Sequence, residues 1–335
     1  MIDVFNHILP PAFVSAVQRI SQRRPLMFDR ACHIPAMSEL DARLRVMDQF
    51  PGYRQVLSLS SPTIEALAMG ASAVELARIG NDALAQLVAQ RRDRFPGFIA
   101  SLPMDQPEAA AREAERAIKE LGAVGVQVYT SVRGQPLDRP ETLALLGVLA
   151  ELRRPIWLHP IRPMTAPDYA EEPVSKFDLW WAFGWPHETS LAMGRLVFAG
   201  VFDRWPELAI ITHHVGGTIP LFAGRIEHGL SLLGTRNPPE HQAAVATTLQ
   251  EPPLAAFRRF FADTASFGSR SALECGRDFF GTEKLLFATD MPFDPEQGTG
   301  FIRETLRAIE EMNLSAAERF AILEGNANRL LGLAP

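Results

Sequence analysis

Four residues that can bind a metal ion or transfer a proton each follow a short apolar stretch, at widely separated points of the chain. They are His7, His159, His214 and Asp290. Each apolar stretch has the composition of a buried β-strand, so each of these side chains stands where a strand ends. Two or three neutral imidazoles with one carboxylate form a common ligand set for Zn²⁺ or a similar divalent ion with an open coordination position. Such an ion polarises a substrate oxygen or generates hydroxide at neutral pH.

The stretch 208–225 holds two adjacent histidines. Its apolar run ends in His213 and His214, which are followed by Gly216 and Gly217. Because side chains alternate along a strand, the sequence predicts that at most one of the two imidazoles faces the centre of a closed sheet. The glycine pair predicts a tight backbone turn beside that ring.

The order of predicted elements explains how such distant residues could meet. Apolar runs that read as strands alternate with amphipathic stretches that read as helices. The predicted strands cover residues 2–5, 53–60, 97–101, 125–129, 155–159, 208–214, 260–263 and 284–290. The predicted helices cover residues 38–50, 72–94, 107–121, 140–152, 187–203, 221–233, 270–280, 299–312 and 315–332. Residues 12–37 read as an irregular excursion, and residues 161–186 read as an insertion rich in proline and tryptophan.

This alternation favours a closed α/β barrel, the (β/α)₈ or TIM barrel, with insertions after strands 1 and 5 and extra helices at the C-terminus. We expect residues 1–335 to form a single domain of this type. An open, doubly wound sheet is the alternative. The barrel is favoured because the four polar residues all lie at carboxyl ends of strands, which converge on one mouth of a barrel. Taken alone, each of the four could be an ordinary turn or capping residue.

Composition excludes several classes of function. The net charge is −6 and no basic run occurs, so the sequence indicates no binding of nucleic acid or of an anionic membrane surface. The isolated Cys32 and Cys275 have no redox or metal-binding spacing and fit a reducing compartment. The first residues lack the features of a signal peptide, and no run approaches the about 20 apolar residues of a membrane span. We therefore expect a cytoplasmic protein.

Several motifs resemble a known family. They are Asp3-Val-Phe-Asn-His7, Trp157-Leu-His-Pro160, Gly184-Trp-Pro-His-Glu-Thr-Ser190, Thr212-His-His-Val-Gly-Gly217, Phe287-Ala-Thr-Asp-Met-Pro-Phe293 and Gly325-Asn-Ala-Asn328. Together they resemble the amidohydrolase-superfamily branch of aminocarboxymuconate-semialdehyde decarboxylase. The resemblance spans nearly the whole chain and is weakest in residues 12–37 and 160–180. Members of that branch include non-oxidative decarboxylases, hydratases and C–C bond hydrolases acting on carboxylated, often aromatic-derived compounds.

The resemblance implies a role for individual residues. His7, His159 and Asp290 match metal ligands, and His214 matches a catalytic histidine that works beside the metal as an acid or base, together with Asp290.

Three further residues are expected to bind the substrate. Arg225 matches an arginine that reaches the site of a neighbouring subunit and holds a substrate carboxylate, which implies a homodimer or a larger homo-oligomer. Arg30 lies near a second substrate-binding arginine, with a register uncertain by one residue, and Trp181 is expected to line the pocket beside Trp180. For each arginine an exposed surface position is the alternative, and for the tryptophans ordinary packing.

The first strand departs from the family pattern. The family places a histidine, or in some decarboxylases a glutamate, two residues before His7, and this chain has Phe5 there. A phenyl ring cannot bind a metal ion. Three consequences follow as alternatives: the ion is held by His7, His159 and Asp290 with water; His214 or another group is recruited; or the site has lost its metal.

Our leading hypothesis is a non-oxidative decarboxylase, a carbon–carbon lyase that acts on a small unsaturated or aromatic-derived carboxylic acid with a divalent ion, expected to be Zn²⁺. A hydrolase or hydratase acting on a related carboxylate is the second hypothesis, because both reactions use the same set of residues. A binding protein without catalytic activity is the third, and only Phe5 suggests it.

Overall fold

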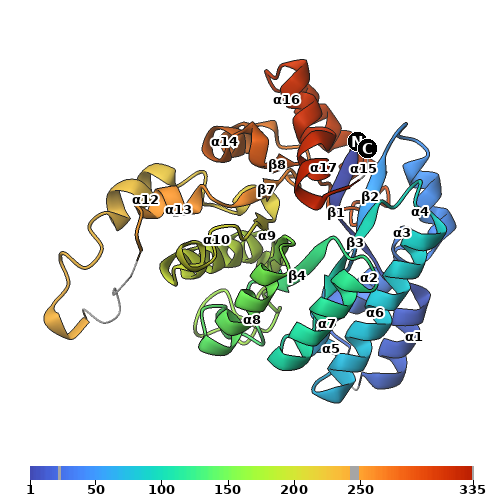
Figure 1. The fold of residues 1–335 in the computed structure, drawn as a ribbon, viewed down its shortest axis with the longest axis horizontal. Coiled ribbons are helices and arrows are strands. Elements are labelled where there is room, and N and C mark those ends of the chain that lie inside the picture. Colours follow the sequence, from blue (N-terminus) through green and yellow to red (C-terminus); the bar gives the residue numbers. More distant parts are fainter. Residues whose placement is uncertain (22–23, 242–248, 334–335) are drawn as a thin grey trace.

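The computed structural model describes residues 1–21, 24–241 and 249–333, and its centre is a barrel of eight parallel strands (Figure 1). Neighbouring strands of the barrel follow one another in sequence order. The strands are β1 (Ile2–Ile8), β2 (Arg54–Leu59), β3 (Gly97–Ser101), β4 (Gly125–Tyr129), β5 (Ile156–His159), β6 (Ile210–Thr212), β7 (Phe261–Asp263) and β8 (Leu285–Leu286). The predicted (β/α)₈ barrel is therefore confirmed. A doubly wound sheet is excluded because its strand order would reverse at a switch point.

Backbone hydrogen bonds between β1 and the chain around β8 close the barrel. The N–H of Val4 donates to the carbonyl of Phe287 (2.9 Å), and the N–H of Asp290 donates to the carbonyl of Phe5 (3.1 Å). Regular strand geometry ends before Asp290, where the backbone φ is 62°. β8 (Leu285–Leu286) is shorter than the strand predicted for residues 284–290, although the chain still hydrogen-bonds to β1 at Phe287 and Asp290.

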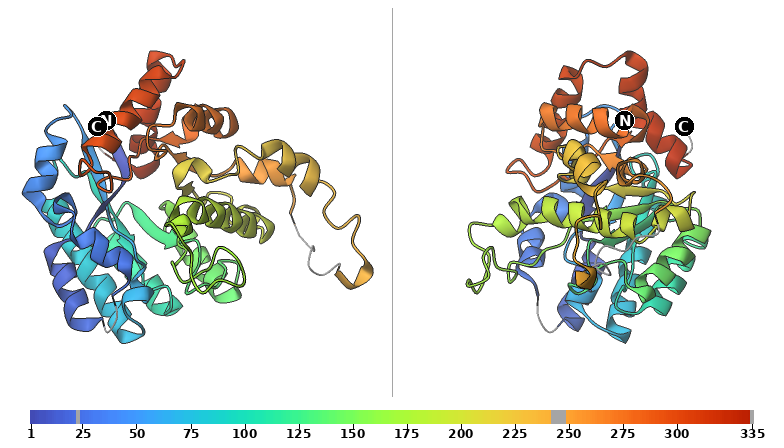
Figure 2. Two further views of the ribbon diagram at one scale, coloured as in Figure 1. Left: turned by 180° about the vertical axis from the view of Figure 1, so that it is seen from behind. Right: turned by 90° about the vertical axis from the view of Figure 1, so that its left-hand side faces the viewer.

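Helices surround the barrel (Figure 2). Those that follow β2 to β5 and β7 are α5 (Ile64–Leu67), α6 (Ala71–Gln90), α7 (Pro107–Lys119), α8 (Pro140–Glu151), α9 (Leu179–Ala182), α10 (Gly184–Phe198), α11 (Val201–Arg204) and α14 (Arg270–Phe280). After β6 come α12 (Ala223–Leu230) and α13 (Pro253–Phe257), and the chain after α12 projects away from the barrel (Figures 1 and 2). The C-terminal helices are α15 (Thr299–Glu311), α16 (Ala316–Phe320) and α17 (Asn326–Leu331), and a π-helical turn at Ala321–Gly325 interrupts the helix predicted for 315–332.

The insertion after β1 is helical, so the prediction of an irregular excursion at 12–37 was wrong. It contains α1 (Pro11–Ile20), α2 (Leu26–Cys32) and α3 (Pro35–Ser38), and α4 (Leu40–Met47) follows. Pro11, which reads as a break in the sequence, occupies the first turn of α1, where a missing backbone N–H costs nothing. The insertion after β5 consists mostly of turns that lead to α9.

Two hydrophobic clusters stabilise this arrangement. One lies between the strands and the helices, and the other fills the inside of the barrel. Trp157 dominates the inner cluster and donates its indole N–H to the carbonyl of Val4 (3.1 Å). A Cβ atom on Gly125 would lie 2.5 Å from that indole ring and 2.3 Å from the carbonyl oxygen of Pro155, so only glycine fits beside Trp157.

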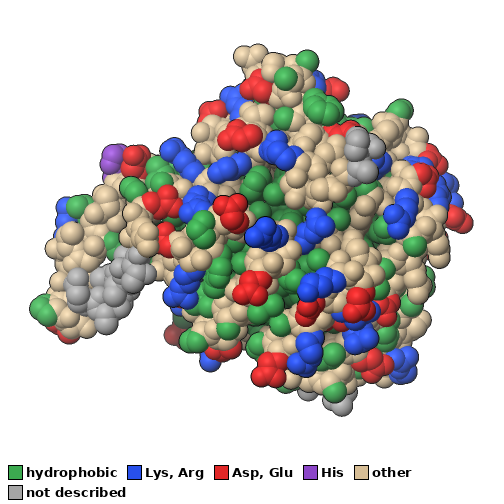
Figure 3. Space-filling view, in the orientation of Figure 1, with side chains coloured by type: hydrophobic (Ala, Val, Ile, Leu, Met, Phe, Trp, Pro, Cys, Tyr) green, Lys and Arg blue, Asp and Glu red, His purple; other side chains and the backbone are tan. Residues whose placement is uncertain are grey.

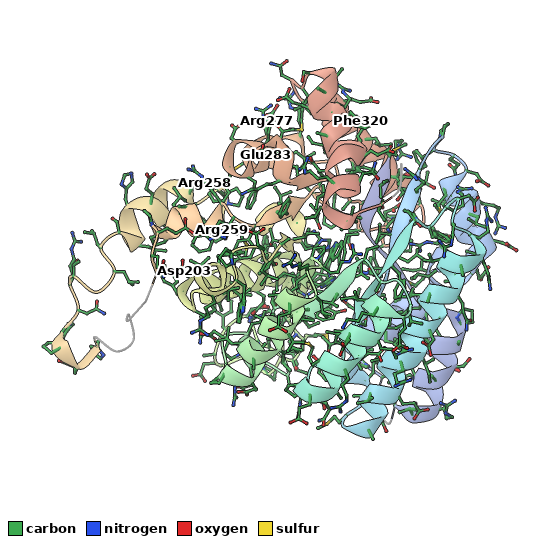
Figure 4. The ribbon with its side chains drawn as sticks, in the orientation of Figure 1. Asp203, Arg258, Arg259, Arg277, Glu283 and Phe320 are labelled. Carbon is green, nitrogen blue, oxygen red and sulfur yellow. The ribbon has the colours of Figure 1, made fainter. Side chains whose placement is uncertain are left out.

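The surface shows how the outer elements are fixed and how charge is distributed. Acidic and basic side chains are interspersed over the face in Figure 3. Two adjacent arginines hold α13 against its neighbours (Figure 4). The guanidinium of Arg259 lies 5.0 Å from the ring centroid of Phe202, and that of Arg258 lies 5.5 Å from the ring centroid of Phe279. Within residues 1–21, 24–241 and 249–333, no helix has the length and apolar character needed to cross a membrane.

Candidate active site

Imidazoles and a carboxylate from four separate parts of the barrel meet at its carboxyl-terminal mouth. Candidate ligand atoms of His7, His159 and His213 lie within 4.8 Å of one another, as do those of His213, His214 and Asp290. The Nε2 of His7 lies 2.9 Å from the Oδ1 of Asp290, and the Nε2 of His213 lies 3.5 Å from the same oxygen. The structure thus brings together the four residues predicted from strand ends and adds His213.

The other ring nitrogen of each buried histidine faces an oxygen atom. The Nδ1 of His7 lies 3.4 Å from the carbonyl oxygen of Leu59, and that of His159 lies 2.5 Å from the carbonyl oxygen of Pro160. The Nδ1 of His213 is hydrogen-bonded to the carboxylate of Asp263. Carbonyl and carboxylate oxygens can only accept a hydrogen bond, so Nδ1 carries a proton, and in the neutral form of each ring Nε2 carries the lone pair. This is the tautomer that a metal-binding histidine uses when its outer neighbour orients it.

A β-bulge and a buried arginine position His7. The register between β1 and β2 shifts between Asp3 and Asn6, so Val4 and Phe5 both reach the inner cluster and His7 points into the mouth. Arg43 from α4 is fully buried and donates to the carbonyl of His7 (2.7 Å) and to the side chain of Asn6. Burial lowers the pKa of Arg43 to about 10, so the guanidinium keeps its charge at neutral pH.

The end of β6 delivers both adjacent histidines to the site, so the prediction that only one could face it was wrong. His213 is still extended (φ −84°), but His214 and Val215 have φ values of 51° and 57°. This left-handed backbone ends the alternation of the strand, and the His213 and His214 ring centroids lie 3.8 Å apart. Such a conformation costs a non-glycine residue about 1–3 kcal/mol and concentrates at functional sites.

The predicted turn after the two histidines is present. Gly217 has a φ of 62°, and a Cβ atom there would lie 2.5 Å from the carbonyl oxygen of Pro186 at the start of α10. The glycine therefore lets the backbone that follows His214 approach α10 closely.

The electrostatics of the site favour positive charge between its carboxylates. Burial opposes the charged form of His213, but Asp263 and Asp290 outweigh it and raise the pKa of His213 to about 9. Burial and the neighbouring His213 lower the pKa of His214 to about 4. Burial would raise the pKa of Asp290, but the imidazoles of His213 and His7 hold it well below its usual value. The two carboxylates thus stabilise a positive charge, either on the protonated ring of His213 or on a metal ion bound next to it.

These residues fit a divalent metal ion. The Nε2 atoms of His7 and His213 are buried and make no hydrogen bond within the part of the chain that the structure describes. Both atoms face the Oδ1 of Asp290, at 2.9 Å and 3.5 Å, so the two imidazole nitrogens and the carboxylate oxygen converge on a position where they could share one cation. Nitrogen donors with one carboxylate oxygen are suited to Zn²⁺ and similar divalent ions.

A pocket of about 540 Å³ opens onto this cluster. His214 and Asp290 form part of its floor, and the remaining lining is mainly apolar and aromatic. Arg30 from α2 and Trp181 from α9 both line it, as predicted for substrate-binding residues, and Arg30 pairs with Asp178 at 3.0 Å. Arg225 is exposed on α12 and does not line the pocket of its own chain.

Comparisons with known proteins agree with the resemblance found in the motifs. The sequence profile of the amidohydrolase family matches residues 28–333. The chain belongs to the amidohydrolase family. It is 32% identical to gamma-resorcylate decarboxylase of Polaromonas sp. strain JS666 over 88% of this chain and 87% of the relative. It is 29% identical to 2-amino-3-carboxymuconate-6-semialdehyde decarboxylase of Dictyostelium discoideum over 100% of this chain and 92% of the relative.

A solved structure extends the comparison to three dimensions. It is that of dihydroxybenzoic acid decarboxylase from Polaromonas sp. JS666 with bound manganese and the inhibitor 2-nitroresorcinol. That protein superposes with a TM-score of 0.78 at 27% identity, covering 99% of this chain and 96% of the other.

Two residues of this amidohydrolase site, His213 and Asp263, are not among those predicted from the sequence. His213 was set aside because only one of the adjacent histidines was expected to face inward. Asp263 was not considered, although it ends the strand predicted for 260–263 and so stands at the same edge as the other candidates. The signal in the sequence for Asp263 is its position as the ionisable last residue of a predicted strand.

Proposed function

We propose that this amidohydrolase is a metal-dependent, non-oxidative decarboxylase of a small aromatic carboxylic acid. The observation that carries the proposal is the position of an aromatic-lined pocket of about 540 Å³ directly above His214 and Asp290. A flat, apolar ring fits such walls, and the single arginine in the lining provides a cation for an acidic group. Relatives that carry the name of aromatic-acid decarboxylases support the same reaction class.

Decarboxylation needs an acceptor for electrons and a source of a proton. Loss of CO₂ leaves the bonding electron pair on the ring carbon, and a neighbouring hydroxyl or carbonyl group of the substrate can accept that pair. A divalent ion held by His7, His159 and Asp290 would supply the positive charge that polarises this oxygen.

His214 is the residue that we place in the proton transfer. Its Nδ1 lies 2.7 Å from the carbonyl oxygen of Ala265, which leaves Nε2 free to act on the molecule in the pocket. Burial, together with the neighbouring His213, lowers the pKa of His214, so the imidazole is neutral at pH 7 and its Nε2 has a lone pair for a proton. It would take the proton of a substrate hydroxyl and deliver it to the carbon that carries the carboxylate. The C–C bond then breaks, CO₂ leaves, and the ring keeps the hydrogen.

The walls of the pocket orient the substrate in this proposal. Arg30 would hold an anionic or hydroxyl group, and Trp181 would stack on the ring. Both come from the insertions, and the guanidinium of Arg30 pairs with Asp178 at 3.0 Å, a carboxylate with which a substrate anion would compete.

Three finer features remain predictions from the sequence. The first is Zn²⁺ as the ion; reconstitution with Zn²⁺ or Mn²⁺, followed by comparison of turnover, tests it. The second is a homodimer in which Arg225 reaches the pocket of the other copy; light scattering of wild type and Arg225→Ala, together with the KM of each, tests it. The third is a cytoplasmic location for this single-domain chain, which fractionation of cells tests.

The test of the proposed reaction is direct. The metal-loaded protein is incubated in D₂O with hydroxybenzoic acids, and CO₂ and the aromatic product are measured. We expect one deuterium at the carbon that loses CO₂, loss of turnover in His214→Ala, and full turnover in the control His228→Ala, whose imidazole lies exposed on α12. Incorporation of ¹⁸O from labelled water without CO₂ release would instead identify a hydrolase or hydratase.

A further inference from the structure

Phe5 occupies the place where the family resemblance leads one to expect a metal ligand. Its ring is buried inside the barrel mouth, and its centroid lies 4.2 Å from that of His213, 4.9 Å from that of His7 and 5.5 Å from that of His159. A phenyl ring therefore lies among three imidazoles and offers none of them a hydrogen bond. If the site holds a metal ion, the first strand supplies one ligand, His7, instead of two.

His213 has the features of a ligand that replaces the missing one. Its side chain is 2% exposed, and its buried Nε2 faces the Oδ1 of Asp290 at 3.5 Å and makes no hydrogen bond with any other described residue. His213 also belongs, with His7 and His159, to a group of residues whose candidate ligand atoms lie within 4.8 Å of one another. When a metal ion takes the place of the proton, this Nε2 lone pair stands beside the carboxylate of Asp290 and two other imidazoles, which is a ligand arrangement and not apolar packing.

Asp263 fixes the orientation of His213. One carboxylate oxygen receives the Nδ1 proton of His213, and the other accepts the backbone N–H groups of His214 (2.9 Å) and Ala265 (3.1 Å). The carboxylate cannot turn without losing these bonds, so the ring of His213 is held with Nε2 toward the mouth. A carboxylate behind a histidine is the usual outer neighbour of a metal-binding imidazole.

We infer that His213, oriented by Asp263, is a metal ligand of this protein and replaces the ligand that Phe5 removes from the first strand. His214 belongs to a second group of candidate ligand atoms, with His213 and Asp290, but its ring lines the pocket, so we assign it to the substrate and not to the metal ion. The inference rests on the metal dependence in the proposed function and not on the reaction, so it holds whether the enzyme is a decarboxylase or a hydrolase.

The inference is tested by metal binding without any substrate. Mn²⁺ is titrated into apoprotein and free Mn²⁺ is followed by electron paramagnetic resonance. Variants are His213→Ala, His214→Ala, Phe5→His and the double variant Phe5→His/His213→Ala. We expect His213→Ala to weaken binding at least about tenfold and His214→Ala to change it less than about threefold, because only the former removes a donor.

The double variant provides the decisive comparison. Phe5→His should strengthen Mn²⁺ binding more in the His213→Ala background than in wild type, because the new imidazole then fills a vacant ligand position. Asp263→Asn should weaken binding about 10- to 100-fold, since an amide in place of the carboxylate disturbs the tautomer of His213. Thermal melting of each apoprotein separates loss of metal from loss of fold, and His213→Asn replaces His213→Ala if the latter does not fold.

Two results would overturn the inference. One is wild-type affinity for Mn²⁺ in His213→Ala together with loss of affinity in His214→Ala, which would make His214 the ligand. The other is an equal effect of Phe5→His in both backgrounds, which would show that the two positions do not substitute for each other. Absence of Mn²⁺ binding in wild type would refute the metal dependence itself, whereas Mn²⁺ binding without decarboxylation would leave the inference intact and refute only the reaction.

Discussion

The buried carboxyl group of Glu65 should make the stability of this protein depend on pH. Glu65 lies on α5, is 6% exposed, and neither carboxylate oxygen has a hydrogen-bond partner among the described residues. Burial, with a smaller contribution from the negative charge of Asp105, raises its pKa from 4.5 to about 7. The folded chain therefore binds this proton more tightly than the unfolded chain.

The sign and size of the effect follow from proton linkage. Between pH 4.5 and pH 7 the folded state holds more protons than the unfolded state, so stability falls as the pH rises. From pH 5 to pH 8 the titration of Glu65 costs about 2.5 kcal/mol of unfolding free energy. Glu65→Gln keeps the shape of the neutral acid and cannot ionise. The variant should thus gain about 2.5 kcal/mol over wild type between the same two pH values.

Urea unfolding of wild type and Glu65→Gln at pH 5 and pH 8 measures this difference, and groups common to both proteins cancel. The control is Glu75→Gln, whose carboxylate is half-exposed and pairs with Arg19 at 2.7 Å. Its effect should vary by less than about 0.5 kcal/mol between the two pH values. A stability difference between Glu65→Gln and wild type that does not change with pH, or that reverses sign, would refute the reasoning.

Three further predictions concern the supports of the site. Gly217→Ala should destabilise the fold by at least about 1 kcal/mol in thermal unfolding, because its φ is 62° and its Cβ would meet the carbonyl of Pro186. Arg43→Met should cost about 3–5 kcal/mol in urea unfolding, since the guanidinium makes four buried hydrogen bonds. Asp178→Asn should lower the KM for an acidic substrate by up to about fivefold with unchanged kcat, because it frees the charge of Arg30 at a partly exposed position.

Matched variants serve as controls for these predictions. Gly224→Ala lies on α12 with no atom within 4 Å of the added Cβ, and Arg45→Met lies on the exposed side of α4. Both should stay within about 0.5 kcal/mol of wild type. Wild-type stability in Gly217→Ala or Arg43→Met would contradict the close packing described for those positions, and a raised KM in Asp178→Asn would show that Asp178 assists binding.

The spacing of hydrophobic residues along the chain predicted most strands and helices of the barrel, because this spacing decides which side chains are buried. The ends of the strands at 97–101 and 125–129 and of the helix at 270–280 agree with β3, β4 and α14. The insertion after β1 was read wrongly because a proline pair marks a helix start as readily as a break. A single sequence does not distinguish these two uses of proline.

The site was harder to predict in detail, because its geometry departs from regular strands. Strand ends pointed to His7, His159 and Asp290, which the structure brings together. The left-handed backbone at His214 and the bulge in β1 change which side chains face inward, and neither has a sequence signal as strong as alternation. For this reason His213 became visible as a site residue only in three dimensions.

The floor and the walls of the pocket come from different parts of the chain. The floor consists of strand ends, which the whole barrel holds in place, whereas Arg30, Asp178 and Trp181 in the walls belong to the two inserted segments. Evolution, or an engineer, can therefore exchange them to admit a different molecule while the atoms that carry out the reaction stay where they are.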